Sequence, residues 1–302
     1  MADDPRVHIG PAGWSYDDWE GIVYGSGLGV ARLDAVADLF RVIEINSTFY
    51  GTPSPRTTEG WARRVAHRTG FQFTAKLVKV FTHDDPRHWT LKARDEFRDA
   101  MKPLSEAGLL GAVLAQFPWF YQAGESNLTR LQRIRNAFPD LPLVLEVRHR
   151  SWLEEGWLEK VSSLGYSFCN VDQPLASSSI ELTSLITGPL GYLRLHGRNR
   201  DKWFSKDAQV HEKYDYLYSE AEIERLVKVC EELRARTDRM FVIANNHFEG
   251  KGPANALEIY QALTGETVRV PPGMLAAFPH LERLKRLQLP NPHVHHAAAG
   301  AH

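Results

Sequence analysis

The 302-residue chain has little cysteine, almost no net charge and no long apolar run. Its two cysteines, Cys169 and Cys230, show no CxxC or other metal-binding spacing, so we expect reduced packing residues in a cytoplasmic protein. A net charge of −1 gives no overall field that attracts nucleic acid, so such binding would need a local patch. No segment approaches the roughly 18 apolar residues of a membrane helix. The opening MADDPRVHIG lacks a signal peptide's apolar core.

Familiar catalytic and nucleotide-binding motifs are missing too. The sequence contains no GxSxG nucleophile elbow and no P-loop. After the first strand-like run the chain reads GPAGW, which is not the glycine-rich dinucleotide fingerprint. These absences argue against several large enzyme classes, and they disfavour a doubly wound open sheet as the fold.

Eight short β-rich runs alternate with helical patterns. Strands are predicted over 7–10, 42–49, 71–76, 111–117, 143–149, 166–172, 191–197 and 240–246. Helices are predicted over 91–107, 127–138, 219–236 and 253–265, and Ser219 with Glu222 forms a capping box. Eight such units predict an α/β fold, a (β/α)8 TIM-type barrel, whose usual size is about 250 residues. The sixth crossover, 174–190, is degenerate because it holds little helical pattern.

We expect one barrel domain over residues 1–270 and a C-terminal extension over 271–302. The extension contains a helical stretch and a histidine-rich tail, HVHHAAAGAH, that we expect to be disordered.

Polar residues fall on one parity in strand after strand. Glu146 and Arg148 lie two apart in LVLEVRH, so their side chains point the same way, opposite to Leu145 and Val147. The outer face of a barrel packs on helices, so we expect the polar set to point inward, near the C-terminal strand ends where barrel active sites lie. That set is Glu44, Asn46, Gln72, Thr74, Lys76, Gln116, Glu146, Arg148, Asn170, Asp172, Arg194 and His196.

Inward carboxylates and histidines suggest acid–base chemistry. We predict Glu146 or Asp172 as the base and His196 as the acid; the alternative is a salt-bridged plug in which Arg148 or Arg194 neutralises Glu146. Lys76, Arg148 and Arg194 are predicted to hold an anion, or else to neutralise the carboxylates. Further predicted substrate-binding residues are Glu44, Asn46, Gln116, Asn170, Asn199 and Asn245.

A divalent metal is a candidate cofactor. His247 follows the last strand, and with His196 and Asp172 it would supply mixed nitrogen and oxygen ligands. The chain has no HExxH or other close ligand spacing, so the metal hypothesis rests on these three residues alone.

Six of the eight tryptophans follow a predicted strand: Trp14, Trp19, Trp89, Trp119, Trp152 and Trp203. All such connections open on one end of a barrel, so we expect an aromatic rim, with Trp14, Trp152 and Trp203 binding the ligand's ring. Ordinary anchoring of the loops is the alternative.

Several motifs, in order, resemble the YecE-like family, the domain of unknown function number seventy-two. They are AGWSYDDWEG, EINSTFYGTPS, the TH of KLVKVFTH, QFPWF, EVRHRSW, YLRLHGRN and ANNHFEGKGPANA. The resemblance runs from about residue 7 to about 265 and implies a β/α barrel, without a settled reaction. One departure is GPAGW, where the family more often reads like G-T-S-G-W.

Together these features favour a hydrolase or lyase acting on an anionic, phosphate-containing ring compound or a nucleic-acid end. The partner is therefore a small anionic substrate or a nucleic-acid end, and no membrane or protein partner is indicated. A common barrel glycosidase arrangement is disfavoured, because Gln116, Arg194 and His196 stand where its paired carboxylates would. A non-catalytic nucleotide or nucleic-acid binding protein and a metal-dependent sugar isomerase are the alternatives.

Overall fold

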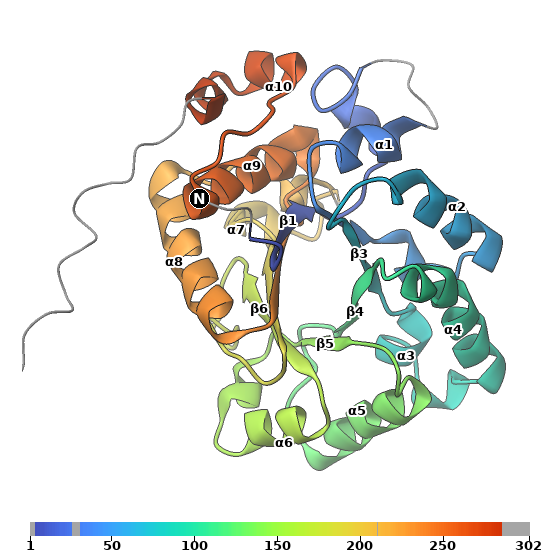
Figure 1. Ribbon diagram of the computed structural model, residues 1–302. Helices are drawn as coiled ribbons and strands as arrows, with labels where there is room; N and C mark the ends of the chain where they lie inside the picture. Colours follow the sequence, from blue (N-terminus) through green and yellow to red (C-terminus); the bar gives the residue numbers. More distant parts are fainter. Residues whose placement is uncertain (1–3, 26–30, 210, 286–302) are drawn as a thin grey trace, which may run out of the picture.

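The computed structural model describes residues 4–25, 31–209 and 211–285, and it is a β/α barrel (Figure 1). All neighbouring strands in its eight-stranded sheet are parallel. The strands are β1 Val7–Pro11, β2 Val42–Ile45, β3 Gln72–Lys76, β4 Leu110–Gln116, β5 Leu143–Glu146, β6 Ser167–Asp172, β7 Leu190–Leu195 and β8 Arg239–Ala244. The predicted TIM-type barrel is confirmed.

The ring of strands closes between β1 and β2. Ala12, directly after β1, forms a parallel bridge with Glu44 of β2, and the Gly13 amide donates to the Glu44 carbonyl at 2.8 Å. Closure leaves no free sheet edge among the described strands, so every strand has neighbours on both sides.

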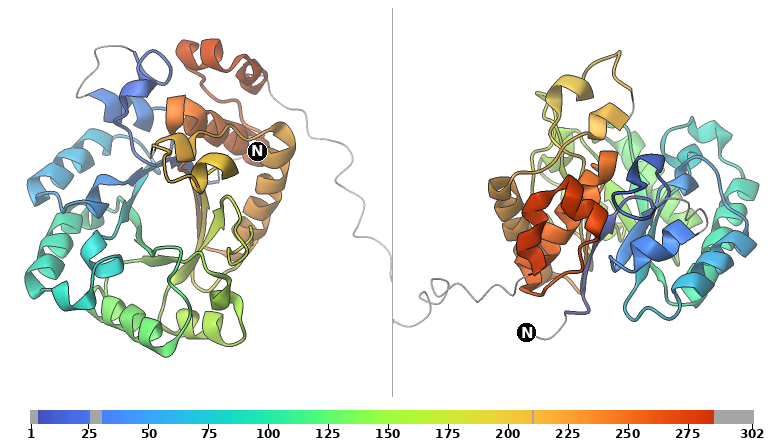
Figure 2. Two further views of the ribbon diagram at one scale, coloured as in Figure 1. Left: turned by 180° about the vertical axis from the view of Figure 1, so that it is seen from behind. Right: turned by 90° about the horizontal axis from the view of Figure 1, so that it is seen from above.

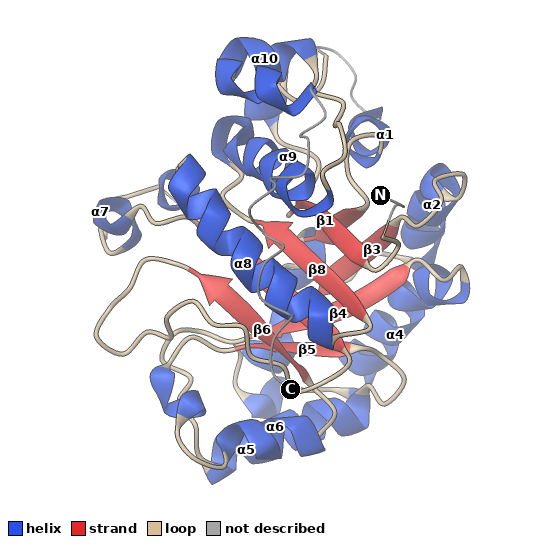
Figure 3. Cartoon of the chain, turned by 60° about the vertical axis from the view of Figure 1, so that its left-hand side comes forward, coloured by secondary structure: helices blue, strands red, loops and turns tan. Residues whose placement is uncertain are grey.

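Helices form the outer layer of the barrel. The α-helices are α1 Arg32–Ala37, α2 Pro55–Val65, α3 Lys79–Thr82, α4 Leu91–Glu106, α5 Glu125–Ala137, α6 Trp157–Ser163, α7 Arg200–Trp203, α8 Glu220–Arg236, α9 Lys251–Thr264 and α10 Pro272–Ala277. Figure 3 shows α8 lying across the outside of the sheet beside β8. The predicted capping box is present at the start of α8, where Ser219 and Glu222 bond each other's backbone amides. None of the described helices is both long and apolar enough to cross a membrane.

Two strands end three or more residues earlier than predicted. The run over 42–49 leaves strand geometry after Ile45 and turns through the short 3₁₀-helix η3 Ser47–Phe49. The run over 143–149 ends at Glu146, and the 3₁₀-helix η5 Arg150–Leu153 follows. In both cases the chain stays buried beyond the end of the strand, at Thr48 after β2 and at Val147 after β5, so the strand-like pattern continues past the strand.

The sixth crossover is degenerate, as predicted. Residues 173–189 contain no helix, and the chain covers the outer side of β6 with irregular backbone. The long connection between β7 and α8 contains α7 and the 3₁₀-helix η6 His211–Tyr214. It lies across one end of the barrel, where it is the yellow segment in both views of Figure 2.

The chain after α9 packs back onto the barrel's outer layer. Helix α10 and the 3₁₀-helix η8 Pro279–Lys285 bury Met274, Leu281 and Leu284 in the main core, and Gln261 of α9 donates to the Leu284 carbonyl at 3.1 Å. The division at residue 270 stays a prediction. The histidine-rich tail lies outside the described residues.

Gly10 tests the tight seam between β1 and β2. A Cβ added to Gly10 would lie 1.9 Å from the Val42 carbonyl oxygen, so Gly10→Ala should force the two strands apart. We expect a loss of about 3 kcal/mol in the free energy of unfolding by urea titration. The matched control is Gly60→Ala in α2, where no atom lies within 4 Å and the helix should gain up to about 1 kcal/mol. Equal effects at the two positions would contradict the close approach.

Candidate active site at the C-terminal end of the barrel

The barrel interior is apolar over much of its depth and polar toward the C-terminal strand ends. The inner apolar cluster is Ala12, Val42, Ala112, Leu114, Val144, Cys169, Val171, Leu190, Tyr192, Phe241 and Ile243. On β2, β5 and β7 the same parity continues into Glu44, Glu146 and Arg194, all fully buried. The inward direction predicted for these three residues is therefore correct.

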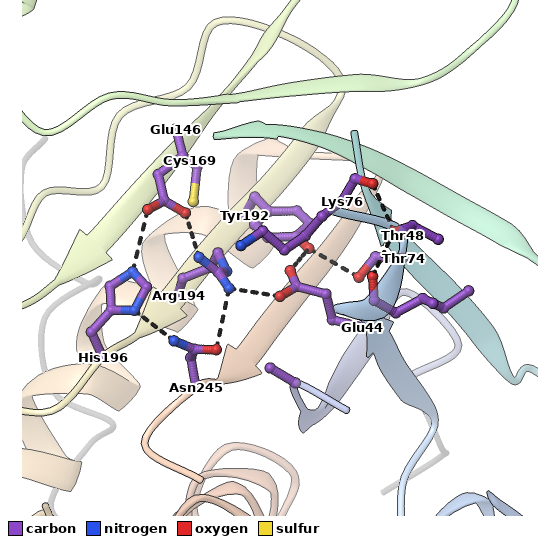
Figure 4. Close-up of polar contacts among 12 residues, drawn as sticks. Glu44, Thr48, Thr74, Lys76, Glu146, Cys169, Tyr192, Arg194, His196 and Asn245 are labelled. Atoms are coloured by element: carbon purple, nitrogen blue, oxygen red, sulfur yellow. Dashed lines mark hydrogen bonds and ion pairs between the residues drawn. The ribbon is translucent and has the colours of Figure 1, made fainter. Parts of the chain in front are cut away.

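Glu44, Glu146 and Arg194, with their hydrogen-bonding neighbours, form a polar layer. Arg194 lies at its centre and joins β2, β5 and β7. Its Nη1 donates to Glu146 Oε2 at 2.6 Å, and its Nη2 donates to Glu44 Oε1 at 2.6 Å (Figure 4). Both carboxylates are completely inaccessible, and 1% of the Arg194 side chain is exposed. A charge at such depth is tolerated only when it is paired and hydrogen-bonded, and the two carboxylates meet that requirement.

Tyr192 completes the coordination of Glu44 from across the barrel. Its hydroxyl lies 3.0 Å from Glu44 Oε2 and 3.0 Å from Thr74 Oγ1. Tyr192 shares the parity of Arg194, two residues away on β7, so the alternation that revealed Arg194 also carried the signal for Tyr192. The sequence reasoning missed it because a tyrosine fits an ordinary apolar strand.

The hydrogen bonds around His196 define its tautomer. Arg194 Nη2 donates to Asn245 Oδ1 at 3.3 Å, which orients the amide so that Nδ2 donates to His196 Nδ1 at 2.9 Å. This orientation favours the tautomer with the ring proton on Nε2, which faces Glu146 Oε1 at 3.3 Å, while Arg148 Nη2, at 3.2 Å, is a competing donor to the same nitrogen. Burial, together with the Arg148 charge, lowers the pKa of His196 to about 3, so the ring is neutral at pH 7.

These protonation states change the predicted acid–base roles. A neutral imidazole lacks the labile proton of the acid predicted at His196. Burial opposes the charge on Glu146, but Arg194, Arg148 and the His196 proton outweigh it and hold the Glu146 pKa well below its usual range. Glu146 is therefore a weak base in this state, and the pair is better described as the ion-paired arrangement that was the alternative.

Arg148 and Lys76 retain hydrogen-bonding capacity. Arg148 directs Nε and Nη2 to Glu146 Oε1, at 3.0 and 2.7 Å, and no described residue bonds its Nη1. Lys76, at the end of β3, forms no ion pair with a described residue, and its Nζ lies 4.5 Å from the centre of the Phe49 ring. Figure 4 shows the Lys76 amine directed toward the Arg194 guanidinium. Both predicted anion-binding side chains thus point into the polar layer.

The parity prediction is wrong for β6. Cys169 and Val171 face the interior, whereas Asn170 and Asp172 face outward. Asn170 binds the irregular crossover, accepting from the Leu185 amide at 2.8 Å and from the Thr183 hydroxyl at 2.7 Å. An outer strand face must be apolar only where a helix covers it, and here polar backbone takes the helix's place.

Asp172 is held outside the polar layer by the β7–α8 connection. Arg198 Nη2 donates to Asp172 Oδ1 at 2.6 Å, and the Tyr218 hydroxyl donates to Oδ2 at 2.5 Å. The catalytic role predicted for Asp172 depended on an inward direction, so the structure does not place it with Glu146 and His196.

The predicted aromatic rim is only partly correct. Trp203 lies at the site, its ring 5.6 Å from the Arg148 guanidinium and 5.9 Å from the His196 ring. Trp14 instead packs against Trp61 of α2. Trp152 is completely buried and donates from Nε1 to the Tyr121 carbonyl at 2.8 Å, so it anchors its loop.

Exposed apolar side chains nevertheless gather around this end of the barrel. Among the described residues, the large exposed ones are Tyr50, Leu91, Trp119, Phe120, Leu153, Leu175, Phe204 and Leu217. Each of them follows a strand in the sequence and precedes the next long element, α2, α5, α6, β7 or α8, except Leu91, which is the first residue of α4. An apolar rim on one face is a feature of ligand-binding surfaces.

The remaining predicted binding residues have mixed placements. Asn46 directly follows β2, and its Oδ1 is buried without a hydrogen-bond partner among the described residues. Gln116 is half-buried beside Glu146 in the sheet register. Asn199 instead shapes the β7–α8 connection, where its side chain caps α7 and donates to the Glu212 and Asp215 carbonyls.

The structure does not bring the predicted metal ligands together. Asp172 forms an ion pair with Arg198, and His196 contacts Glu146. The His247 ring stacks on the Tyr16 ring, with 4.5 Å between the ring centres. Over residues 4–25, 31–209 and 211–285, no group of three or more histidine, cysteine or carboxylate side chains could hold a metal ion. The ligand trio predicted from the sequence is therefore wrong.

The fold and site define a β/α-barrel protein with a buried ion-pair network at the C-terminal strand ends. The chain belongs to the family described as "Protein of unknown function DUF72", whose model matches residues 8–278. The UPF0759 protein YunF of Bacillus subtilis is 26% identical, covering 90% of this chain and 100% of YunF. The UPF0759 protein YecE of Escherichia coli K12 is 25% identical, over 57% of this chain and 59% of YecE.

Solved structures of the same family share the fold. A DUF72 family protein from Thermotoga maritima has a TM-score of 0.77 and 32% identity, covering 85% of this chain and 98% of that one. A DUF72 family protein from Enterococcus faecalis has a TM-score of 0.77 and 24% identity, covering 88% of this chain and 98% of that one. The family resemblance inferred from the motifs is confirmed.

Glu146→Gln tests the ion-pair network. The change keeps the side chain's shape but leaves Arg194 with one charged partner in a completely buried site. We expect the free energy of unfolding to fall by about 3–5 kcal/mol, measured by urea titration. Glu155→Gln is the control, because its carboxylate is exposed and forms no ion pair with a described residue. Equal stability of the two variants would contradict a network that needs both carboxylates.

The lowered pKa of His196 predicts how stability depends on pH. The folded pKa of about 3 lies below the ordinary value of 6.5, so the unfolded chain binds the proton first as pH falls. The His196 contribution is constant above about pH 7.5 and is lost below it, by about 2 kcal/mol at pH 5 relative to pH 8. Urea titrations at pH 8 and pH 5 should show a smaller loss in the free energy of unfolding for His196→Gln than for the wild type. Identical losses would mean that His196 is not held neutral.

Proposed function

We propose that the C-terminal end of the barrel binds an anionic, phosphate-containing ring compound, and that the protein is a hydrolase or lyase acting on it. The observation that carries this proposal is a charge imbalance. Lys76, Arg148 and Arg194 bring three cations into the polar layer, whereas Glu44 and Glu146 bring two carboxylates. An anion placed there would balance the excess charge.

The unused donors support the same ligand. Arg148 Nη1 and Lys76 Nζ have no hydrogen-bond partner among the described residues, and the Arg148 side chain is 12% exposed, so solvent reaches it. A guanidinium together with an ammonium is a common arrangement for holding phosphate oxygens. Because Glu146 fixes one edge of the guanidinium, Arg148 pays little conformational entropy when it binds.

The aromatic side chains support a ring in the ligand. Trp203 lies against the Arg148 guanidinium, and Tyr50, Trp119, Phe120 and Phe204 are exposed on the same end of the barrel. Exposed aromatic rings stack on planar ligand rings, including nucleobases, so a nucleotide or nucleic-acid end belongs to the proposed ligand class. A cytoplasmic location fits such a ligand and forms part of the proposal.

A protein that binds such a compound without turnover is the second candidate. It is favoured by the protonation states of Glu146 and His196, because an ionised Glu146 with a lowered pKa is a weak base and a neutral imidazole is a weak acid. An enzyme and a binding protein would use the same anion site. Analysis for reaction products, with each ligand that is found to bind, distinguishes the two candidates.

Thermal-shift measurements with inorganic phosphate, nucleoside monophosphates and sugar phosphates test the anion site. A ligand at 100 times its Kd should stabilise the protein by about 2.7 kcal/mol. Arg148→Lys should weaken phosphate binding about tenfold or more. A lysine ammonium lacks the planar guanidinium that can bond Glu146 and a phosphate at the same time. Arg150→Lys is the matched control, since Arg150 is exposed and two residues away. Equal binding by both variants, or no stabilisation by any phosphate compound, would contradict the proposal.

A further inference from the structure

We propose that Lys76 is a nucleophilic amine that forms an imine with the carbonyl group of a phosphate-bearing aldehyde or ketone. This inference rests on the proposed function and deepens it, because it names the substrate class and favours a lyase over a hydrolase. It assigns the covalent step to a side chain that the sequence placed among the anion-binding residues.

Lys76 differs from the other charged groups of the polar layer. Arg194 bonds both Glu44 and Glu146, and Arg148 bonds Glu146, so each of these four groups is already paired. Lys76 has no ion pair with a described residue. Its hydrogen-bonding neighbour Thr48 contacts only the Lys76 backbone carbonyl, at 2.7 Å. Among the described charged groups of the polar layer, Lys76 is thus the one that no carboxylate pairs.

The surroundings of Lys76 increase the share of neutral amine, although the charged form still predominates at pH 7. Phe49 lies 4.5 Å from Nζ, so one side of the amine faces an apolar ring. Burial, and next the Arg194 charge, lower the pKa of Lys76 to about 8, while Glu44 and Glu146 oppose the shift. Relative to an ordinary lysine at 10.5, this gives about 300-fold more neutral amine at pH 7. A neutral amine is the form that attacks a carbonyl carbon.

The position of Lys76 in the barrel suits imine formation with a phosphate-bearing substrate. It is the last residue of β3 and points into the polar layer (Figure 4), and Arg148, two residues beyond the end of β5, bonds Glu146 in the same layer. Burial, followed by the charges of Lys76, Arg130 and Arg148, lowers the pKa of His83 to about 4, so these cations act on one common neighbour. A phosphate held by Arg148 Nη1 would leave the substrate's carbonyl end within the polar layer.

The step balances without any oxidant or reductant. The neutral Nζ adds to the carbonyl carbon, and as the N–C bond forms an Nζ proton passes to the carbonyl oxygen, which gives a carbinolamine. The carbinolamine takes up one proton from water, loses its oxygen as water and becomes a protonated imine. The imine accepts the electron pair of the bond between the adjacent carbon and a hydroxyl-bearing carbon, the hydroxyl gives its proton to water, and that fragment leaves as an aldehyde or ketone. The enamine left on Lys76 is protonated by water and hydrolysed, which restores the amine and completes the chemistry of a lyase.

Pyridoxal 5′-phosphate is a suitable probe, because it carries an aldehyde, a ring and a phosphate. We expect imine formation to appear as absorbance near 420 nm, and borohydride reduction followed by peptide mass spectrometry to place the label mainly on Lys76. The rate should rise with pH and level above about 8, the pKa of Lys76. An ordinary lysine would keep gaining reactivity toward 10.5.

Lys76→Arg and Lys79→Arg form the matched pair of variants. Lys76→Arg keeps the positive charge but cannot form an imine, so the 420 nm band should fall at least tenfold. Lys79→Arg, an exposed residue on the neighbouring helix α3, should leave the band unchanged. Mass spectrometry of the wild type locates the label even if Lys76→Arg fails to fold. Labelling spread over exposed lysines, with Lys76 unmodified, would overturn the inference.

Comparing pyridoxal 5′-phosphate with pyridoxal separates the inference from the proposed function. Labelling of Lys76 at lower concentrations of the phosphorylated probe, with protection by inorganic phosphate, would support both. Labelling of Lys76 by both probes equally would keep the nucleophile and overturn the anion site. Stabilisation by phosphate that depends on Arg148, without labelling of Lys76 by either probe, would overturn the nucleophile and keep the anion site.

Discussion

The charge on Arg194 is the constraint on which the polar end of this barrel depends. A guanidinium in a barrel interior loses its hydration, and only close carboxylates offset that cost. Glu44 and Glu146 reach it from β2 and β5, so three strands are tied through one side chain. The neighbouring groups donate hydrogen bonds to the carboxylates: Tyr192 donates to Glu44, and Arg148 donates to Glu146.

This network sets what the remaining groups can do. With both carboxylates occupied by arginines, no carboxylate is left for Lys76, and the layer carries an excess positive charge. The same arrangement keeps His196 neutral and Glu146 ionised, which moves the chemistry away from the pair that the sequence favoured. The structure thus leaves an unpaired amine beside an arginine with a free donor, and the proposals for anion binding and imine formation both start from that combination.

Strand alternation predicted the barrel and most of its polar centre, because a β/α barrel has only two environments for a strand side chain. It succeeded on β5 and β7, where helices cover the outer face. It failed for Asn170 and Asp172, because the crossover after β6 has no helix and its backbone satisfies polar groups on the outside. The position of a tryptophan in a connection gave no direction either, so Trp14, which packs on Trp61, and Trp152, which anchors its loop, were not distinguished from Trp203.

A crystal structure of the protein with a bound phosphate ester would test the central claim most directly. The account predicts an anion bonded to Arg148 Nη1 and Lys76 Nζ, with the Arg194 bridges to Glu44 and Glu146 unchanged. An anion bound elsewhere, with Arg148 and Lys76 still unoccupied at saturating ligand, would contradict the account.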